Sequence, residues 1–180
     1  MLLGVQYVMS SKWALTERFV ITDQMGTALL EVRGNFGLVK HISFHDQSGR
    51  VLAELKKHVM TNKYEVLLEG KHAAEVHHHG VFGQHYEIDT SQGRVEARGD
   101  FAGWNYTLGR GGAIIAQVSR EAAFRERFFV QTAPGENDVF LLAAILAIDN
   151  IHDERREHDQ GMGGGVPGMG MGMGGTRGFP

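Results

Sequence analysis

The chain has 180 residues, a length that suits one ordinary domain with its own hydrophobic core. Its 18 basic and 21 acidic side chains give a formal net charge of −3 with neutral histidines, which excludes a global cationic field for holding nucleic acid or an anionic membrane. An anion site must therefore be a local patch. The absence of cysteine excludes a disulfide framework, a thiolate zinc site and a thiol nucleophile.

The N-terminal stretch MLLGVQYVMSSKW lacks the basic start, the continuous apolar centre and the small-residue cleavage site of a secretory signal. We therefore expect a cytoplasmic protein, either freely dissolved or peripheral to a membrane. The charge balance further predicts that the chain does not bind nucleic acid.

Six segments follow in which apolar and polar residues alternate around a glycine, a pattern typical of a strand, a tight turn and a second strand. In the first segment, Phe19 and Ile21 fall on one face of the strand before the turn. In three turns an aspartate that can cap its own loop precedes the glycine, at Asp23, Asp46 and Asp89. The turn glycines are Gly26, Gly49, Gly70, Gly93, Gly112 and Gly135.

The segment EVRGNF at residues 31–36 returns as EARGDF at residues 96–101, and each copy lies between the first and second units of a group of three. The chain therefore reads as two copies of a three-hairpin half. About twelve strands bury their apolar faces best by closing into an antiparallel barrel, because closure also removes exposed sheet edges. The glycine of each copy marks a corner where the backbone passes closely. This corner also explains the RGD tripeptide better than an adhesion motif, because the RGNF copy has no adhesion meaning.

Residues 137–155 break the strand period and predict a helix, with Asn137 or Asp138 as its N-terminal cap and with alanine and leucine as strong helix formers. The run from Val139 to Ile148 is apolar on every side. It is about half as long as a bilayer span, so we expect no transmembrane segment. A helix that is apolar all round must be buried by protein, which predicts that it fills the barrel.

The chain from Gly161 onward is mostly glycine and methionine, with no period that could fold back on itself. We therefore divide the sequence into one barrel domain at residues 1–155 and a disordered tail at residues 156–180. No activity is assigned to the tail.

The chain contains, in order, FVITDQMGTALLEVRGNF, ISFHDQSGRVLAEL, YEVLLEGKHAAEV, VEARGDFAGWNYTLGRGGAIIAQVSR and NDVFLLAAILAIDNI. This succession resembles the LURP-one-related proteins, which belong with the tubby C-terminal domain and the phospholipid scramblases. The resemblance covers residues 5–152 and rests on the ordered hairpins and the closing helix rather than on a catalytic motif. It implies a closed antiparallel barrel of twelve strands with the C-terminal hydrophobic helix threaded through the interior.

The resemblance also bears on function. Tubby-like relatives bind phosphoinositides through basic surface residues, scramblases move lipids with calcium, and most LURP-one-related proteins have no established biochemical activity. This chain departs from the scramblases, because it has no calcium loop with alternating oxygen ligands and no cysteine-rich palmitoylation segment. Its acidic residues near the end of the predicted helix are typical of a solvated helix terminus.

Two groups of basic residues occupy equivalent positions in the two halves, around the connection into the third hairpin of each. If a pseudo-twofold axis relates the halves, the groups form two separate patches, and each can hold an anionic headgroup or a phosphate. The alternative is ordinary solubilising charge on loops. The candidates are Lys56, Lys57 and Lys63 in the first half and Arg120, Arg125 and Arg127 in the second.

Histidines cluster in EVHHHGVFGQH, where His77 and His79 point to one face of a strand and His85 follows after a turn. Two imidazoles at this spacing can bind a transition metal, but no nearby carboxylate supplies an obvious third ligand. We therefore interpret these residues as surface histidines, like His41 and His45 on the solvent side of another strand, and expect neither a metal site nor a cofactor.

An enzymatic function has little support in the sequence. The glycines of GRGGA fall in a hairpin turn without the strand-to-helix context of a phosphate loop, and no serine lies in a nucleophile elbow. The sequence therefore predicts a non-enzymatic binding or scaffold module of the LURP-one-related type, with phosphoinositides, other anionic headgroups or a protein partner as its ligands. The alternative is a scramblase-like protein that handles phospholipids.

Overall fold

The computed structural model describes residues 6–10, 18–35, 40–58, 60–61, 63–78, 85–120 and 127–162. Within these ranges the chain forms twelve strands and one helix. They are β1 (Gln6–Ser10), β2 (Arg18–Thr22), β3 (Ala28–Asn35), β4 (His41–His45), β5 (Val51–His58), β6 (Lys63–Leu68), β7 (Lys71–His78), β8 (His85–Thr90), β9 (Gly93–Asp100), β10 (Asn105–Arg110), β11 (Ala113–Arg120), β12 (Arg127–Thr132) and α1 (Asp138–Met162).

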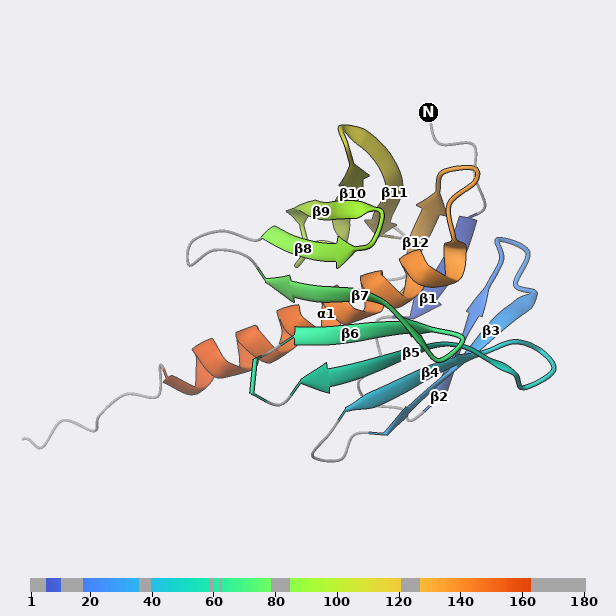
Figure 1. Ribbon diagram of the computed structural model, residues 1–180, viewed down its shortest axis with the longest axis horizontal. Helices are drawn as coiled ribbons and strands as arrows, with labels where there is room; N and C mark the ends of the chain where they lie inside the picture. The colour runs from blue at the N-terminus through green and yellow to red at the C-terminus, as the bar shows by residue number, and fades with distance from the viewer. Residues whose placement is uncertain are drawn as a thin grey trace, which may run out of the picture.

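The strands form one closed antiparallel barrel, which confirms the predicted fold class. The strands from β2 to β12 pair with their neighbours in chain order, and β1 pairs with both β2 and β12 to complete the ring (Figure 1). The β1–β12 ladder runs from Gln6 opposite Gln131 to Ser10 opposite Arg127. The β1–β2 contact that closes the ring is shorter, a single pair of Val8 opposite Thr22.

The closing strand differs from the predicted set of six hairpins. The sixth unit, RFFVQTAPGEN, contains the single strand β12, because the chain turns at Gly135 and then enters α1 instead of returning as a strand. The position beside β12 is taken by β1, from the other end of the sequence. Tyr7 and Met9 of β1 belong to the core cluster, so this short strand completes the apolar interior of the second half.

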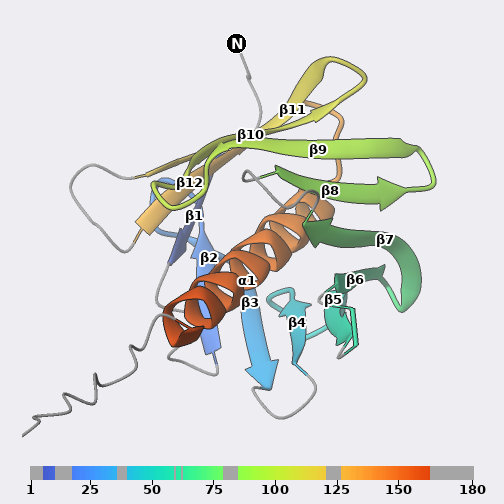
Figure 2. The ribbon, with the colours of Figure 1, turned by 90° about the vertical axis from the view of Figure 1, so that its left-hand side faces the viewer.

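Helix α1 passes through the barrel, and Figure 2 shows the strands arranged around it. Residues 140–152 are buried, which confirms that the helix forms the centre of the core. Asn137 is the N-terminal cap, since its Oδ1 accepts a hydrogen bond from the Phe140 backbone N–H at 3.0 Å. Asp138 has another role: its carboxylate accepts a hydrogen bond from the Tyr7 hydroxyl at 2.6 Å and ties α1 to β1.

The helix continues to Met162, beyond the predicted end at 155. The reason is local, because Glu154, Arg155 and Arg156 are good helix formers and no glycine or proline interrupts them. In the part of the chain that the structure describes, no helix combines the length and the hydropathy needed to cross a membrane. The remainder of the predicted tail, residues 163–180, lies outside the described residues.

The barrel has two ends that differ in their connections. At the end that we call the turn end, the tight turns within the hairpins and the link from β12 to α1 meet around the N-terminus of the helix. At the opposite end, which we call the exit end, the chain connects one hairpin to the next and α1 projects beyond the strands (Figure 1).

Two of the three predicted aspartate-capped turns are confirmed. The Oδ1 atom of Asp23 accepts hydrogen bonds from the backbone N–H groups of Met25 and Thr27, at 2.9 and 2.8 Å. Asp46 caps its own loop in the same way, two and four residues ahead. The bond from the Thr27 N–H lowers the pKa of the Asp23 carboxyl group, and a bond from the Ser48 hydroxyl at 2.6 Å, together with the backbone N–H groups, lowers that of Asp46.

The prediction for Asp89 is wrong. The turn between β8 and β9 has only two residues, so Asp89 still lies within β8, where its carboxylate pairs with Arg94 at 3.0 Å. The Oγ1 atom of Thr90 caps the turn instead, accepting a hydrogen bond from the Gln92 backbone N–H at 3.1 Å. Thr90 stands next to the turn, so its hydroxyl reaches the Gln92 backbone N–H, whereas the Asp89 carboxylate is paired with Arg94.

The corner predicted at the RGDF segment is present at Gly99. Its φ angle is 140°, and a Cβ atom there would lie 2.6 Å from the carbonyl oxygen of Asn105 and 2.7 Å from the Cα of Tyr106. Only glycine therefore permits β9 and β10 to approach so closely at the exit end. In the RGNF copy, Gly34 lies within β3 opposite Ile42, where no comparable close approach is found among the described residues, and residues 36–39 lie outside them.

Candidate ligand-binding sites

The three lysines predicted in the first half do not share one face of β5 and β6. Lys56 and Lys63 lie on the outer wall of the barrel, where Lys63 Nζ is 2.6 Å from Glu75 and Lys56 Nζ is 3.8 Å from Glu54. Lys57 follows Lys56 directly, and the period of two turns it toward the interior. The outer wall here therefore carries mixed charge rather than a purely cationic patch.

At the exit end, Lys57 helps to hold α1. The carboxylate of Glu154 accepts hydrogen bonds from Lys57 Nζ at 2.7 Å, from Lys40 Nζ at 2.6 Å and from the Tyr64 hydroxyl at 3.0 Å. Burial would raise the pKa of the Glu154 carboxyl, but the two ammonium groups outweigh it and hold the pKa below its ordinary value. Burial, reinforced by the Glu154 charge, raises the pKa of the Tyr64 hydroxyl.

The basic group predicted in the second half is described only in part. Arg127 is exposed at the start of β12, and Arg120 is the last residue of β11. The side chain of Arg120 and the whole of Arg125 lie outside the described residues. Both strand ends belong to the exit end, as Lys57 does, so the two predicted groups lie toward the same end of the barrel.

The turn end contains a pocket of about 450 Å³, a volume within the range of small-ligand sites. Four separate parts of the chain line it, namely the turns between β6 and β7 and between β8 and β9, the end of β10, and the link into α1. The lining has both an apolar and a polar part. Leu68, Ala73 and Phe140 provide the apolar part, and the polar side chains are Lys71, His72, Thr90, Ser91, Gln92, Arg110, Glu136 and Asn137.

Two of the basic side chains in this pocket already have acidic partners. Arg110 Nη1 lies 3.1 Å from each carboxylate oxygen of Glu136, and His72 Nδ1 lies 2.9 Å from Glu65. Lys71 is exposed and makes no ion pair with any of the described residues. Its ammonium group is therefore the uncompensated charge of the pocket.

Large apolar side chains are exposed at the turn end. Met25 in the β2–β3 turn is 92% exposed, Ile114 beside the β10–β11 turn is 52% exposed, and Val51 at the start of β5 is 38% exposed. Exposed apolar side chains at one end of a domain are a feature of surfaces that meet a membrane or a partner. Met60 is exposed at the exit end, so an exposed apolar side chain does not by itself distinguish the two ends. The apolar groups of the turn end support a contact surface only together with the pocket.

The outer wall of β7 and β8 supplies carboxylates that the sequence analysis did not find for the histidine cluster. His77 Nε2 lies 3.5 Å from Glu87, and His85 Nε2 lies 3.7 Å from the same carboxylate. His79 lies outside the described residues. The missed signal was strand register, since the pairing of β7 with β8 sets His77 directly opposite Glu87.

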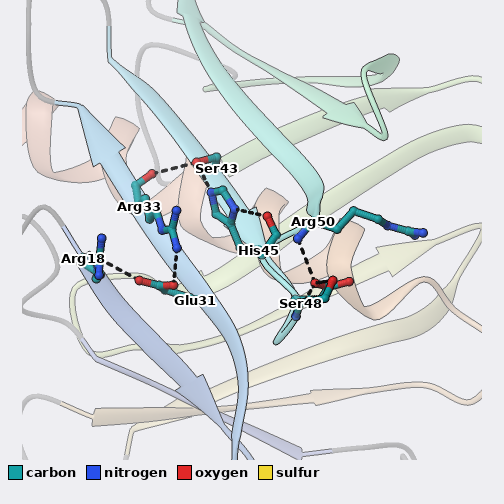
Figure 3. A network of polar contacts seen from close by, with 9 residues as sticks. Arg18, Glu31, Arg33, Ser43, His45, Ser48 and Arg50 are labelled. Atoms are coloured by element: carbon teal, nitrogen blue, oxygen red, sulfur yellow. Dashed lines mark hydrogen bonds and ion pairs between the residues drawn. The ribbon is translucent and has the colours of Figure 1, made fainter.

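The prediction that His45 is a solvent-side residue is wrong. Its side chain points to the outer wall, yet the residue is only 8% exposed. Its Nε2 lies 2.8 Å from the Ser43 Oγ and its Nδ1 lies 3.1 Å from the carbonyl oxygen of Gly49 (Figure 3). The turn after β4 therefore lies next to the imidazole of His45. His41 is half-exposed, as predicted, and lies 2.7 Å from Glu54.

Some polar side chains lie inside the barrel, beside the second half of α1. The Tyr86 hydroxyl is 3.2 Å from His152 Nδ1, and burial raises the pKa of Tyr86 to about 12 and lowers the pKa of His152. The Tyr106 hydroxyl is buried without a hydrogen-bond partner among the described residues. Phe101 packs edge-on against Tyr86, so aromatic packing surrounds this group. We infer that these residues have a structural role and hold α1 in place within the barrel.

Comparison with known proteins agrees with this architecture. The family model for LURP-one-related proteins matches residues 5–149. Among the solved structures that match is the X-ray structure of a protein from Arabidopsis thaliana, with a TM-score of 0.62 and 17% sequence identity, over 83% of this chain and 91% of that one. At that identity the likeness shows the fold alone. No curated protein matches the chain.

Proposed function

This chain belongs to the LURP-one-related family, and we propose that it is a non-enzymatic binding module for a phosphate-bearing anionic headgroup held in the turn-end pocket. The observation that supports this most directly is Lys71 on the rim of that pocket, which has no ion-pair partner among the described residues. By contrast, the predicted Lys57 and Lys63 each lie within 2.7 Å of a glutamate oxygen. A ligand that binds those lysines must first displace a carboxylate.

The electrostatics of the pocket favour an anion. Among the residues that line the pocket, the charges of Arg110 and Glu136 offset each other and Lys71 adds one positive charge. Glu65, which does not line the pocket, offsets His72 when that imidazole is protonated. The cap residue Asn137 also lines the pocket, which brings the positive end of the helix dipole next to the ligand. The Ser91 hydroxyl adds a donor that suits phosphate oxygens.

The surroundings of the pocket suit a membrane surface. The exposed side chains of Met25, Val51 and Ile114 belong to the same end of the barrel as the pocket. In an end-on approach, these apolar groups meet the boundary between headgroups and acyl chains while Lys71 reaches a headgroup phosphate. This arrangement needs no segment that crosses the bilayer.

The non-enzymatic part of the proposal follows from packing. In many barrels a ligand occupies the interior, but here residues 140–152 of α1 are buried within it. A ligand must therefore bind at an end or on the outer wall. The turn-end pocket is open to solvent. The hydroxyl of Thr90 donates to the carbonyl oxygen of Gly93 and the imidazole of His72 pairs with Glu65, so among the described residues no hydrogen bond joins a pocket hydroxyl to His72 as in an activated nucleophile.

Co-sedimentation with lipid vesicles tests the proposal. The purified chain is expected to sediment with vesicles that contain phosphoinositides and not with neutral phosphatidylcholine vesicles, and physiological salt should weaken the binding relative to low salt. Lys71→Glu is expected to weaken binding by about fivefold to thirtyfold, because each cation near an anionic surface contributes on the order of 1 kcal/mol. Lys56→Glu reverses the same charge on the outer wall and serves as the matched control, with binding retained.

Other outcomes assign the function elsewhere. Loss of binding in Lys56→Glu but not in Lys71→Glu would move the site to the outer-wall lysines predicted from the sequence. Absence of binding at both salt concentrations would reject a headgroup ligand and leave a protein partner. The scramblase-like alternative predicts calcium-dependent redistribution of a labelled lipid between leaflets, which a binding module does not produce.

A further inference from the structure

A cluster of metal-ligating side chains lies on the outer wall of β7, β8 and β9, away from the turn-end pocket. One potential ligand atom from each of His85, Glu87 and Glu96 lies within 4.8 Å of the other two. Glu87 of β8 stands directly opposite Glu96 of β9 in the strand ladder. On its other side Glu87 stands opposite His77 of β7. Two imidazoles and two carboxylates therefore converge from three adjacent strands.

The two glutamates create a local excess of negative charge. Like charges that face each other across a strand pair are destabilising. Each glutamate has an arginine beside it, since Arg94 lies 3.1 Å from Glu87 Oε2 and Arg98 lies 2.5 Å from Glu96 Oε2. With Asp89 included, three carboxylates face two guanidinium groups, which leaves one net negative charge when the histidines are neutral. A cation at the cluster would remove that excess.

The burial of Glu87 makes a cation more favourable there than on an ordinary acidic surface. Residues on the outer wall of β8 should be solvated, but Glu87 is only 5% exposed. A buried carboxylate needs close, oriented positive partners. The two carboxylate oxygens of Glu87 have imidazoles near them on opposite sides, His85 at 3.7 Å from Oε1 and His77 at 3.5 Å from Oε2. The Nδ1 of His77 is buried without a hydrogen-bond partner among the residues that the structure describes, and it lies 3.8 Å from Asp89.

We propose that His85, Glu87 and Glu96 bind a first-row divalent transition metal ion such as Zn²⁺. Imidazole nitrogen and carboxylate oxygen are a normal donor set for such ions. Bonds of about 2.0–2.2 Å require the ligand atoms to lie about 3.3–3.6 Å apart. The half-exposed side chain of Glu96 can rotate to bring its oxygen closer to the other two ligands.

This inference is independent of the proposed headgroup site, because the two sites share no residue. Calorimetric titration of the purified chain with Zn²⁺, after removal of bound metal with a chelator, is the direct test. The expected result is saturable binding of one equivalent, with the affinity lowered at least tenfold in His85→Ala and in Glu96→Gln. His72→Ala is the matched control, because His72 pairs with Glu65 at 2.9 Å on the outer wall but belongs to no such cluster. Its affinity should stay within twofold of the parent chain.

A second readout guards against a variant that fails to fold. Co²⁺ substituted for Zn²⁺ should give visible absorption bands that change in Glu96→Gln, a substitution at a half-exposed side chain whose fold can be verified by circular dichroism. Unchanged Zn²⁺ affinity in both His85→Ala and Glu96→Gln would overturn the proposal. An equal loss in His72→Ala, or no saturable binding in the parent chain, would overturn it as well.

Discussion

At the exit end of the barrel two lysines are turned toward the helix, whereas at the turn end the lysine on the pocket rim faces solvent. Lys40 and Lys57 both donate to Glu154, and their charge is used to hold α1. Lys71 has no such partner among the described residues. The exit end is denser in basic residues, yet the turn end offers the charge that is available to a ligand.

This difference shows that the number of basic residues in a segment is a poor guide to an anion site. A lysine that is within 2.7 Å of a half-buried carboxylate contributes to stability, and a ligand must compete with that carboxylate. An exposed lysine beside a concave surface needs no such exchange. Substitutions at each end can separate the structural role of the exit end from the ligand-binding role proposed for the turn end.

Truncation of the helix core should have the largest effect, because it removes packing between the two ends. Leu142→Ala deletes a fully buried side chain and is expected to lower the free energy of unfolding by about 2–5 kcal/mol. Urea unfolding followed by circular dichroism measures this change. Arg156→Ala, at an exposed position of the same helix, is the control and should stay within about 0.5 kcal/mol. A similar value for both variants would contradict a tightly packed interior.

Glycine substitutions should differ between the ends. At the exit end, Gly99→Ala places a Cβ 2.6 Å from a backbone oxygen at a positive φ and is expected to cost about 2–4 kcal/mol. At the turn end, Gly49 also has a positive φ, but no atom lies within 4 Å of its Cβ position. Gly49→Ala should therefore cost only about 1–2 kcal/mol. The same unfolding assay decides, and equal losses would contradict the close approach of β9 and β10.

The ion pairs of the exit end should make stability depend on pH. Glu154→Gln keeps the shape but removes the charge that Lys40 and Lys57 face, and we expect a loss of about 1–3 kcal/mol at neutral pH. The folded-state pKa of Glu154 is lowered from 4.5, so its stabilising contribution is present above that value and is lost as the pH falls through the folded pKa. The difference between the variant and the parent chain should shrink in acid. A constant difference from pH 7 to pH 3 would argue against this ion pair.

Charge reversal at the turn end should have the smallest effect on stability. Lys71 is exposed and has no ion-pair partner among the described residues, so Lys71→Glu should change the free energy of unfolding by less than about 0.5 kcal/mol. Urea unfolding beside Glu154→Gln provides the comparison. A large loss in Lys71→Glu would mean that this lysine also serves the fold, and the contrast between the ends would disappear.

The fold could be predicted from local patterns because each hairpin carries its own signal. Alternation sets the strands, the aspartates at positions 23 and 46 with the following glycines set two of the turns, and the run from Val139 to Ile148 sets the buried helix. The strand β1 was not predicted as the partner of β12, because its pairing depends on residues more than 100 positions away. A pairing between strands so far apart in the chain cannot be predicted from local sequence patterns.

The sites were less predictable, and for two different reasons. The grouping of Lys56 with Lys57 overlooked a local rule, since adjacent strand residues point to opposite faces. Likewise the two-residue turn of the β8–β9 hairpin implies the pairing of Glu87 with Glu96. The turn-end pocket is another matter, because four separate parts of the chain assemble it and only the closed barrel brings them together.

The most direct test of the account is the comparison of Lys71→Glu with Lys56→Glu in co-sedimentation with phosphoinositide vesicles at physiological salt. The account predicts that the parent chain and Lys56→Glu sediment with these vesicles and that Lys71→Glu largely stays in the supernatant. Equal sedimentation of all three chains, or sedimentation of none, would contradict a headgroup site in the turn-end pocket.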